Sequence, residues 1–162
     1  MFFEEDIRTI SPEMNFHKIT ASIFGIGYLK GGGSYAAAVI CLVWYFVLNG
    51  HSTNWIVVLA VIAITLSGVW SGNQLEKIWG KDSSRIVIDE VAGMAIGLLF
   101  VPVAWKYIVI SFVLFRFFDI TKVLYIRRLE ILPGGWGVMG DDVLAGIYTN
   151  IVLQVILYYK LV

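Results

Sequence analysis

Five long apolar stretches follow one another along the chain and decide what it can fold into. They cover residues 35–48, 55–70, 86–101, 105–118 and 143–159. Hydrophobic residues make up 59% of the chain and charged residues only 15%, whereas a typical soluble domain carries about 25% charged residues. Because backbone that crosses a bilayer must satisfy its own hydrogen bonds, the sequence predicts an all-α, polytopic membrane bundle of about five short spans.

The connection between the third and fourth stretches determines which residues share a side. One long helix over 86–118 would place Asp89 and Asp119 on opposite faces of the bilayer. Pro102 disfavours a continuous helix, because proline lacks the backbone N–H and clashes with the preceding turn. A hairpin broken at Pro102 returns both aspartates to the same face, and this is the interpretation that we prefer.

The hairpin also assigns the connecting segments to two sides. The N-terminal region and segments 71–85 and 119–142 fall on one side, and the other connections and the C-terminus fall on the opposite side. Of the 12 lysines and arginines, all but Lys106 and Lys160 lie on the first side. Since cytoplasmic segments carry an excess of positive residues, the first side is predicted to face the cytoplasm.

The remaining features indicate one integral-membrane domain over residues 1–162, with residues 1–20 as an N-terminal cytoplasmic segment. Residues 16–34 are expected to include a short amphipathic or re-entrant helix that ends at Gly31–Gly33. The net charge is zero, which argues against a nucleic-acid-binding surface, where a basic excess is expected.

Acidic residues from three separate stretches are expected to meet at the cytoplasmic face: Asp89, Glu90, Asp119, Asp141 and Asp142. Helix capping explains at most one carboxylate of each adjacent pair. Several like charges need compensation, and hard oxygen ligands without a cysteine cluster favour Mg²⁺ over Zn²⁺. We expect the metal core on Asp89, Asp119 and Asp142, with Glu90 and Asp141 as further ligands or their neighbours.

Basic residues near the acids offer a site for an anion. Arg116, Asp119 and Lys122 are spaced i, i+3, i+6 and share nearly one helix face, which fits either an intrahelical salt bridge or two cations that bind a phosphate. The glycine-rich segment 132–142 could add backbone N–H groups. The residues alone therefore predict a metal-dependent protein that acts on a membrane-embedded anionic substrate.

Three motifs in this order resemble the phosphatidylglycerophosphatase A family: IVIDEVAGM, FRFFDITK and GGWGVMGDDVLAGIY. SGNQLEKIWGKDSSR also resembles the segment that precedes the first motif, so that the resemblance covers about residues 20–150. It implies Mg²⁺-dependent hydrolysis of the terminal phosphomonoester of phosphatidylglycerophosphate, an anionic glycerophospholipid, to give phosphatidylglycerol. It also implies a multi-pass enzyme of the bacterial inner membrane with its site facing the cytoplasm.

Residue by residue, the resemblance implies that Asp89, Asp119 and Asp142 are catalytic and that Glu90 and Asp141 also belong to the acidic site. It adds polar positions that would contact the substrate: Asn73, Glu76, Lys77, Arg116 and Lys122. The attacking group is open between a metal-activated water and an aspartate. The chain departs from the family pattern at DITKVLYIRR, where a proline usually follows the lysine, and at GGGSYAA.

Two other functions fit part of the pattern. Carboxylates within membrane helices can mark an ion path, which would suit a small cation-binding transporter or channel subunit. A phosphatase of the same superfamily with a different phosphorylated substrate is the other alternative.

Overall fold

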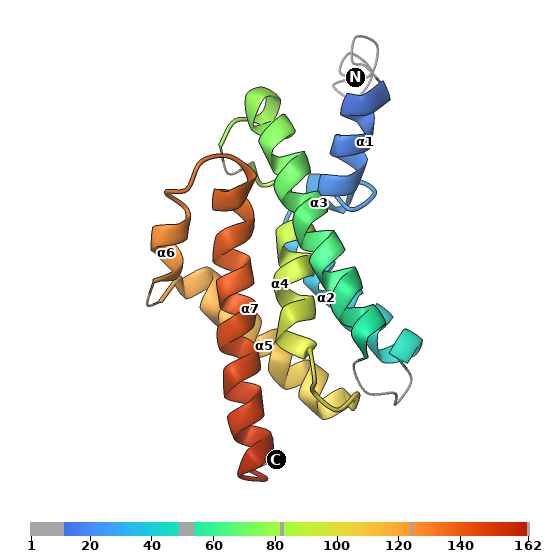
Figure 1. The fold of residues 1–162 in the computed structure, drawn as a ribbon, viewed down its shortest axis with the longest axis vertical. Helices are drawn as coiled ribbons and strands as arrows, with labels where there is room; N and C mark the ends of the chain where they lie inside the picture. The colour runs from blue at the N-terminus through green and yellow to red at the C-terminus, as the bar shows by residue number, and fades with distance from the viewer. Residues whose placement is uncertain (1–11, 49–53, 82, 124, 162) are drawn as a thin grey trace.

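The computed structural model describes residues 12–48, 54–81, 83–123 and 125–161, which form helices and no strand. Seven α-helices and one 3-10 helix follow in order within these ranges: α1 (Pro12–Ala21), η1 (Ile26–Tyr28), α2 (Gly32–Leu48), α3 (Trp55–Trp79), α4 (Ile88–Leu98), α5 (Trp105–Thr121), α6 (Ile126–Leu129) and α7 (Gly135–Tyr158) (Figure 1). The predicted all-α class is therefore confirmed for the described part of the chain.

Each predicted apolar stretch coincides with one helix, but two helices extend well beyond it. Helix α3 continues past residue 70 to Trp79, because residues 74–79 are mostly good helix formers even where they are polar. Helix α7 begins at Gly135 rather than at 143. Among the described helices, α3 and α7 are long and apolar enough to cross a membrane, and α2 is a shorter apolar helix. The five-span arrangement stays a prediction.

The predicted break between the third and fourth stretches is present. Helix α4 ends at Leu98 and α5 begins at Trp105, so Pro102 lies in the connection. The side-chain amide of Asn150 in α7 donates to the carbonyl of Leu99 at 2.7 Å and to two carbonyls of the last turn of α4. These bonds satisfy backbone acceptors that a helix end leaves without partners. In Figure 1 this connection lies at the end of the bundle near the C-terminus.

Helix α4 lies at the centre and packs against α7, α3, α2 and α5. A Cβ atom at Gly146 of α7 would lie 2.9 Å from the carbonyl carbon of Gly93 in α4, and one at Gly93 would lie 2.8 Å from the carbonyl carbon of Asp142. The two backbones therefore touch, as small residues permit in membrane helix pairs. This contact brings the first turn of α4 beside the acidic turn of α7.

The N-terminal region differs from the prediction. Helix α1 ends at Ala21, and Gly31–Gly33 stand at the start of α2 rather than at the end of a helix. Gly25 and Gly31 have φ values of 96° and 79°, a backbone conformation that favours glycine and separates the two helices. Helix α1 packs on α3. Residues 1–11 of the predicted cytoplasmic segment and 49–53 of a predicted turn lie outside the described residues.

Candidate active site

A cavity of about 180 Å³ lies among α4, α5, α7 and the segment before α4. Its polar lining includes Lys122, Ser83 and Ser84. It also includes six carboxylates: Asp89, Glu90, Asp119, Glu130, Asp141 and Asp142. The five acidic residues singled out in the sequence therefore line one cavity, although they come from three different helices.

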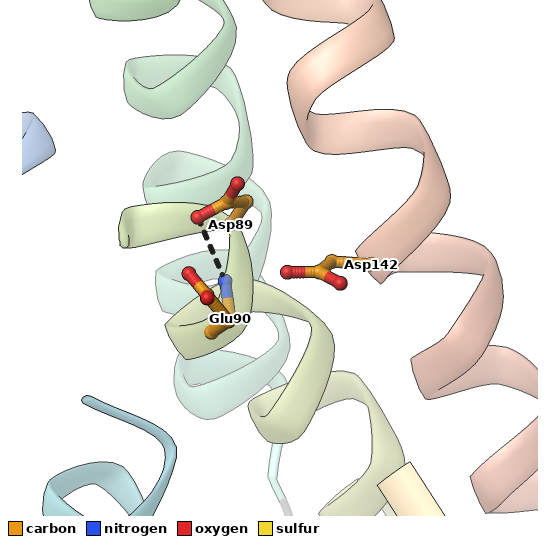
Figure 2. Close-up of side chains that lie close together, drawn as sticks. All are labelled: Asp89, Glu90 and Asp142. Carbon is orange, nitrogen blue, oxygen red and sulfur yellow. Dashed lines mark hydrogen bonds between the residues drawn. The ribbon is translucent and has the colours of Figure 1, made fainter. Parts of the chain in front are cut away.

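Three of these carboxylates form the tightest group. Asp89, Glu90 and Asp142 each offer an oxygen atom, and these atoms lie within 4.8 Å of one another. Figure 2 shows Asp89 and Glu90 on adjacent positions of α4, with Asp142 facing them from α7. The backbone N–H of Glu90 donates to Asp89 Oδ1 at 3.1 Å. Glu90 takes the place in this group that the sequence interpretation gave to Asp119.

The other carboxylates of the cavity already have cationic partners. Asp119 accepts from Arg116 at 2.5 Å within α5. Asp141 accepts from Lys122 Nζ at 2.8 Å, and Glu130 also pairs with Lys122. Within the described residues, Asp89, Glu90 and Asp142 take part in none of these ion pairs. Positive charge is therefore in deficit at this one group.

This group fits a hard divalent cation. Carboxylate oxygens are the ligands that Mg²⁺ takes in proteins. Glu90 Oε2 is buried and has no hydrogen-bond partner among the described residues, and burying such an atom is costly unless something binds it. Asp142, 3% exposed, is also shielded from water. The donor set therefore fits a hard divalent cation such as Mg²⁺.

Lys122 occupies a position that helix periodicity does not predict. It ends α5 with φ 46° and ψ 42°, in the left-handed region, so it leaves the helix face shared by Arg116 and Asp119. The side chain turns instead to Asp141 and Glu130. Burial by itself lowers the pKa of the Lys122 ammonium, but these hydrogen bonds outweigh it and raise the pKa above the ordinary value. Lys122 is therefore a cation at neutral pH.

Glu130 is a residue of the site that the sequence motifs do not predict. The short helix α6 falls in the connecting segment 119–142 and ends just before Glu130, whose side chain pairs with Lys122. The available signal was an acidic residue between the FRFFDITK and GGWGVMGDD motifs, on the same predicted side as Lys122.

Neither adjacent acidic pair caps its helix. Asp89 and Glu90 lie in the first turn of α4, after Val87 at the N-cap. Asp141 and Asp142 lie inside α7, which begins at Gly135. Both pairs are therefore available for a role other than capping.

The predicted substrate-binding residues are split between two places. Lys122 lines the cavity, and Arg116 pairs with Asp119 at its wall. The other three lie on the last turns of α3 and are absent from the cavity lining: Asn73, Glu76 and Lys77. Asn73 Oδ1 accepts from the Gly135 N–H at 2.8 Å and so holds the start of α7.

Glu90 also depends on space that α2 provides. A Cβ atom at Gly33 would lie 2.6 Å from Cδ of Glu90. Contacts of this length essentially never occur for a real Cβ, so the carboxylate of Glu90 occupies the volume that a side chain at position 33 would need. The glycine-rich start of α2 therefore serves the acidic group.

The fold and cavity define a helical protein with a carboxylate-rich site beside Lys122, which is held by two ion pairs. The family model described as phosphatidylglycerophosphatase A matches residues 19–157, and the chain belongs to this family. It is accordingly a phosphoric monoester hydrolase, and a lipid phosphatase within that class.

Individual relatives agree with this placement but differ in their names. A protein of Bacteroides thetaiotaomicron, provisionally named phosphatidylinositol-3-phosphatase, is 44% identical over 126 residues, which are 76% of this chain and 79% of that protein. Phosphatidylglycerophosphatase A of Haemophilus influenzae is 48% identical over 49% of this chain and 50% of its own. That of Escherichia coli is 37% identical over 55% and 54%. No solved structure matches the chain.

Proposed function

We propose that this protein hydrolyses the terminal phosphomonoester of phosphatidylglycerophosphate to give phosphatidylglycerol, in a Mg²⁺-dependent reaction. The observation that carries the proposal is the group of three carboxylates next to Lys122, which form no ion pair with any residue that the structure describes. Membership in the phosphatidylglycerophosphatase A family supports the choice of substrate.

Each part of the cavity has a role in this proposal. Asp89, Glu90 and Asp142 would hold the cation, which when bound offsets their charge and polarises a phosphate oxygen. Lys122, oriented by Asp141 and Glu130, stabilises negative charge on the phosphate. Arg116 neutralises Asp119 and adds positive charge at the same wall. Asp119 lines the cavity, and we propose that it takes part in catalysis together with Asp89 and Asp142.

We place this chemistry in a single membrane-embedded domain of the bacterial inner membrane, with five spans and the acidic cavity toward the cytoplasm. The lengths and apolar composition of α3 and α7 support a membrane location. The excess of lysine and arginine on the side that holds the acidic motifs supports a cytoplasmic site.

A second substrate follows from the Bacteroides relative. Its name gives phosphatidylinositol 3-phosphate as the substrate, and that lipid also presents a phosphomonoester on a glycerophospholipid headgroup. The same cavity could therefore serve a different headgroup, and the two lipids need to be compared directly.

The test is phosphate release by the full chain in detergent micelles, from phosphatidylglycerophosphate and from phosphatidylinositol 3-phosphate. We expect release from the first lipid with Mg²⁺, release at the level of the blank with EDTA, and recovery when excess Mg²⁺ is restored. Full activity in metal-free buffer would contradict the metal requirement. Faster release from the phosphoinositide would replace the proposed substrate with the second one.

The Gly33→Ala substitution tests whether Glu90 is a ligand of the cation. The added methyl group meets the end of a flexible side chain rather than backbone, so the fold is expected to persist while the Glu90 carboxylate moves. Changes to groups that support metal ligands typically weaken metal affinity by about 10–100-fold, and we expect a shift of that size in the Mg²⁺ concentration that gives half-maximal activity. Ser34→Ala, in the same turn, is the control. An unchanged Mg²⁺ dependence in Gly33→Ala would remove Glu90 from the ligand set.

A further inference from the structure

An apolar groove lies between α2 and α5, separate from the acidic cavity. Its volume is about 220 Å³, and all of its lining residues are apolar. Helix α2 contributes Ala38, Cys41 and Leu42, and α5 contributes Trp105, Val109 and Phe112 among others. Leu42 and Val109 are 45% and 52% exposed, so the groove opens sideways to the surroundings of the bundle.

The α5 wall of the groove leads to the acidic cavity. Trp105, Val109 and Phe112 recur at helical spacing and form one stripe along α5. The same spacing continues to Arg116 and then to Asp119, which lines the cavity. At 1.5 Å per residue, Phe112 lies about 6 Å along the helix from Arg116, and Trp105 lies about 21 Å from Asp119.

The α2 wall leads to the same place. Ala38 is one turn from Ser34, and Ser34 adjoins Gly33, against which the Glu90 carboxylate lies. The groove is therefore bounded by two helices that both reach the acidic site. The start of α2 contacts Glu90, and the last turns of α5 carry the Arg116–Asp119 pair.

We infer that this groove binds an acyl chain of the phospholipid whose phosphate enters the acidic cavity. The inference rests on the proposed function, because it requires a lipid substrate. A headgroup in the cavity is tied covalently to its acyl chains, and at least one chain must leave past the wall of the cavity. The groove is lined by apolar residues, its α5 wall begins one helical turn from Arg116, and its lining residues Leu42 and Val109 are exposed to the surroundings.

Chain-length preference tests this inference. The measured quantity is the ratio of kcat/KM for dipalmitoyl phosphatidylglycerophosphate to kcat/KM for the dihexanoyl lipid. Ala38→Phe and Val109→Phe fill the groove and are each expected to lower this ratio by about tenfold, a loss of about 1.4 kcal/mol of chain binding. Val109 is half exposed, so its variant tests the groove even if Ala38→Phe fails to fold.

The matched control is Ala60→Phe, which places the same side chain at an exposed position of α3 that lines neither cavity. It is expected to keep the wild-type ratio. A wild-type ratio in folded Val109→Phe would overturn the inference, as would an equal loss in Ala60→Phe, because the groove would then have no particular role.

Photo-crosslinking separates this inference from the proposed reaction. We expect a phosphatidylglycerophosphate analogue with a diazirine on its acyl chain to label residues 38–42 and 105–112, and excess unlabelled substrate to reduce that labelling. Phosphate release without such labelling would overturn the groove and leave the proposed function standing. Competable labelling without phosphate release would support the groove as a lipid site and contradict the proposed reaction.

Discussion

Replacing Asp142 with asparagine is expected to lower Mg²⁺-dependent phosphate release by about 10²–10³-fold or more, the range for removing one electrostatic contributor from an active site. Asp142 is 3% exposed and is one of the three carboxylates that form no ion pair within the described part of the chain. Asparagine keeps the shape of the side chain but removes a negative ligand. The rate is measured as phosphate release at saturating Mg²⁺.

A second readout distinguishes a metal ligand from a residue that only maintains the fold. Without metal, the group holds like charges at close range, and these repel one another. Removing one charge is therefore expected to raise the thermal unfolding temperature in EDTA, and to reduce the further stabilisation that Mg²⁺ provides to the wild type. A merely structural residue would lower the unfolding temperature in both conditions.

The control for this substitution is Glu13→Gln, which removes one negative charge from an exposed position of α1. It is expected to change neither the rate nor the response to Mg²⁺. Full activity of both Asp142→Asn and Asp89→Asn would contradict the proposed site.

Gly146→Leu is expected to have the largest effect on stability. A Cβ atom there would lie 2.9 Å from the carbonyl carbon of Gly93 and 3.0 Å from its Cα, and both are backbone atoms that cannot rotate away. Helices α4 and α7 must then separate, at a typical cost of about 1–3 kcal/mol for overpacking. Because the same contact holds Asp142 beside Asp89 and Glu90, we also expect the response to Mg²⁺ to weaken.

Thermal unfolding in detergent and a Mg²⁺ titration of activity measure the two consequences. Ile147→Leu places a leucine at the next residue of α7, which is 40% exposed, and is expected to behave as the wild type. Wild-type stability and Mg²⁺ dependence in Gly146→Leu would show that the close approach of the helices has no role in forming the site.

Structural features that depend on residues close together in the chain could be predicted from the sequence. The apolar stretches mark α2, α3, α4, α5 and α7, and Pro102 marks the break between α4 and α5. The boundaries were less accurate where glycines occur. The predicted start of α7 and the predicted helix end at Gly31–Gly33 were wrong. Packing against other helices compensates the low helix propensity of glycine at these places.

The candidate site shows the same division. The motifs identified five of the six carboxylates in the cavity, because like charges beside apolar stretches need compensating positive charge. They did not show that Lys122 leaves its helix in a left-handed conformation, nor that α6 carries Glu130 to it. Asn73 is one of the polar residues that the sequence predicts to contact the substrate. Only its hydrogen bond with Gly135 shows that it holds the start of α7.

The helical class, the break at Pro102 and five of the six carboxylates in the cavity follow from the sequence alone, because helix periodicity, proline chemistry and charge burial act over a few residues. Which carboxylates form one group and which are already paired with a cation depends on how the helices pack. That outcome depends on the distance between helices, and Gly93 and Gly146 set this distance between two segments that are far apart in the chain.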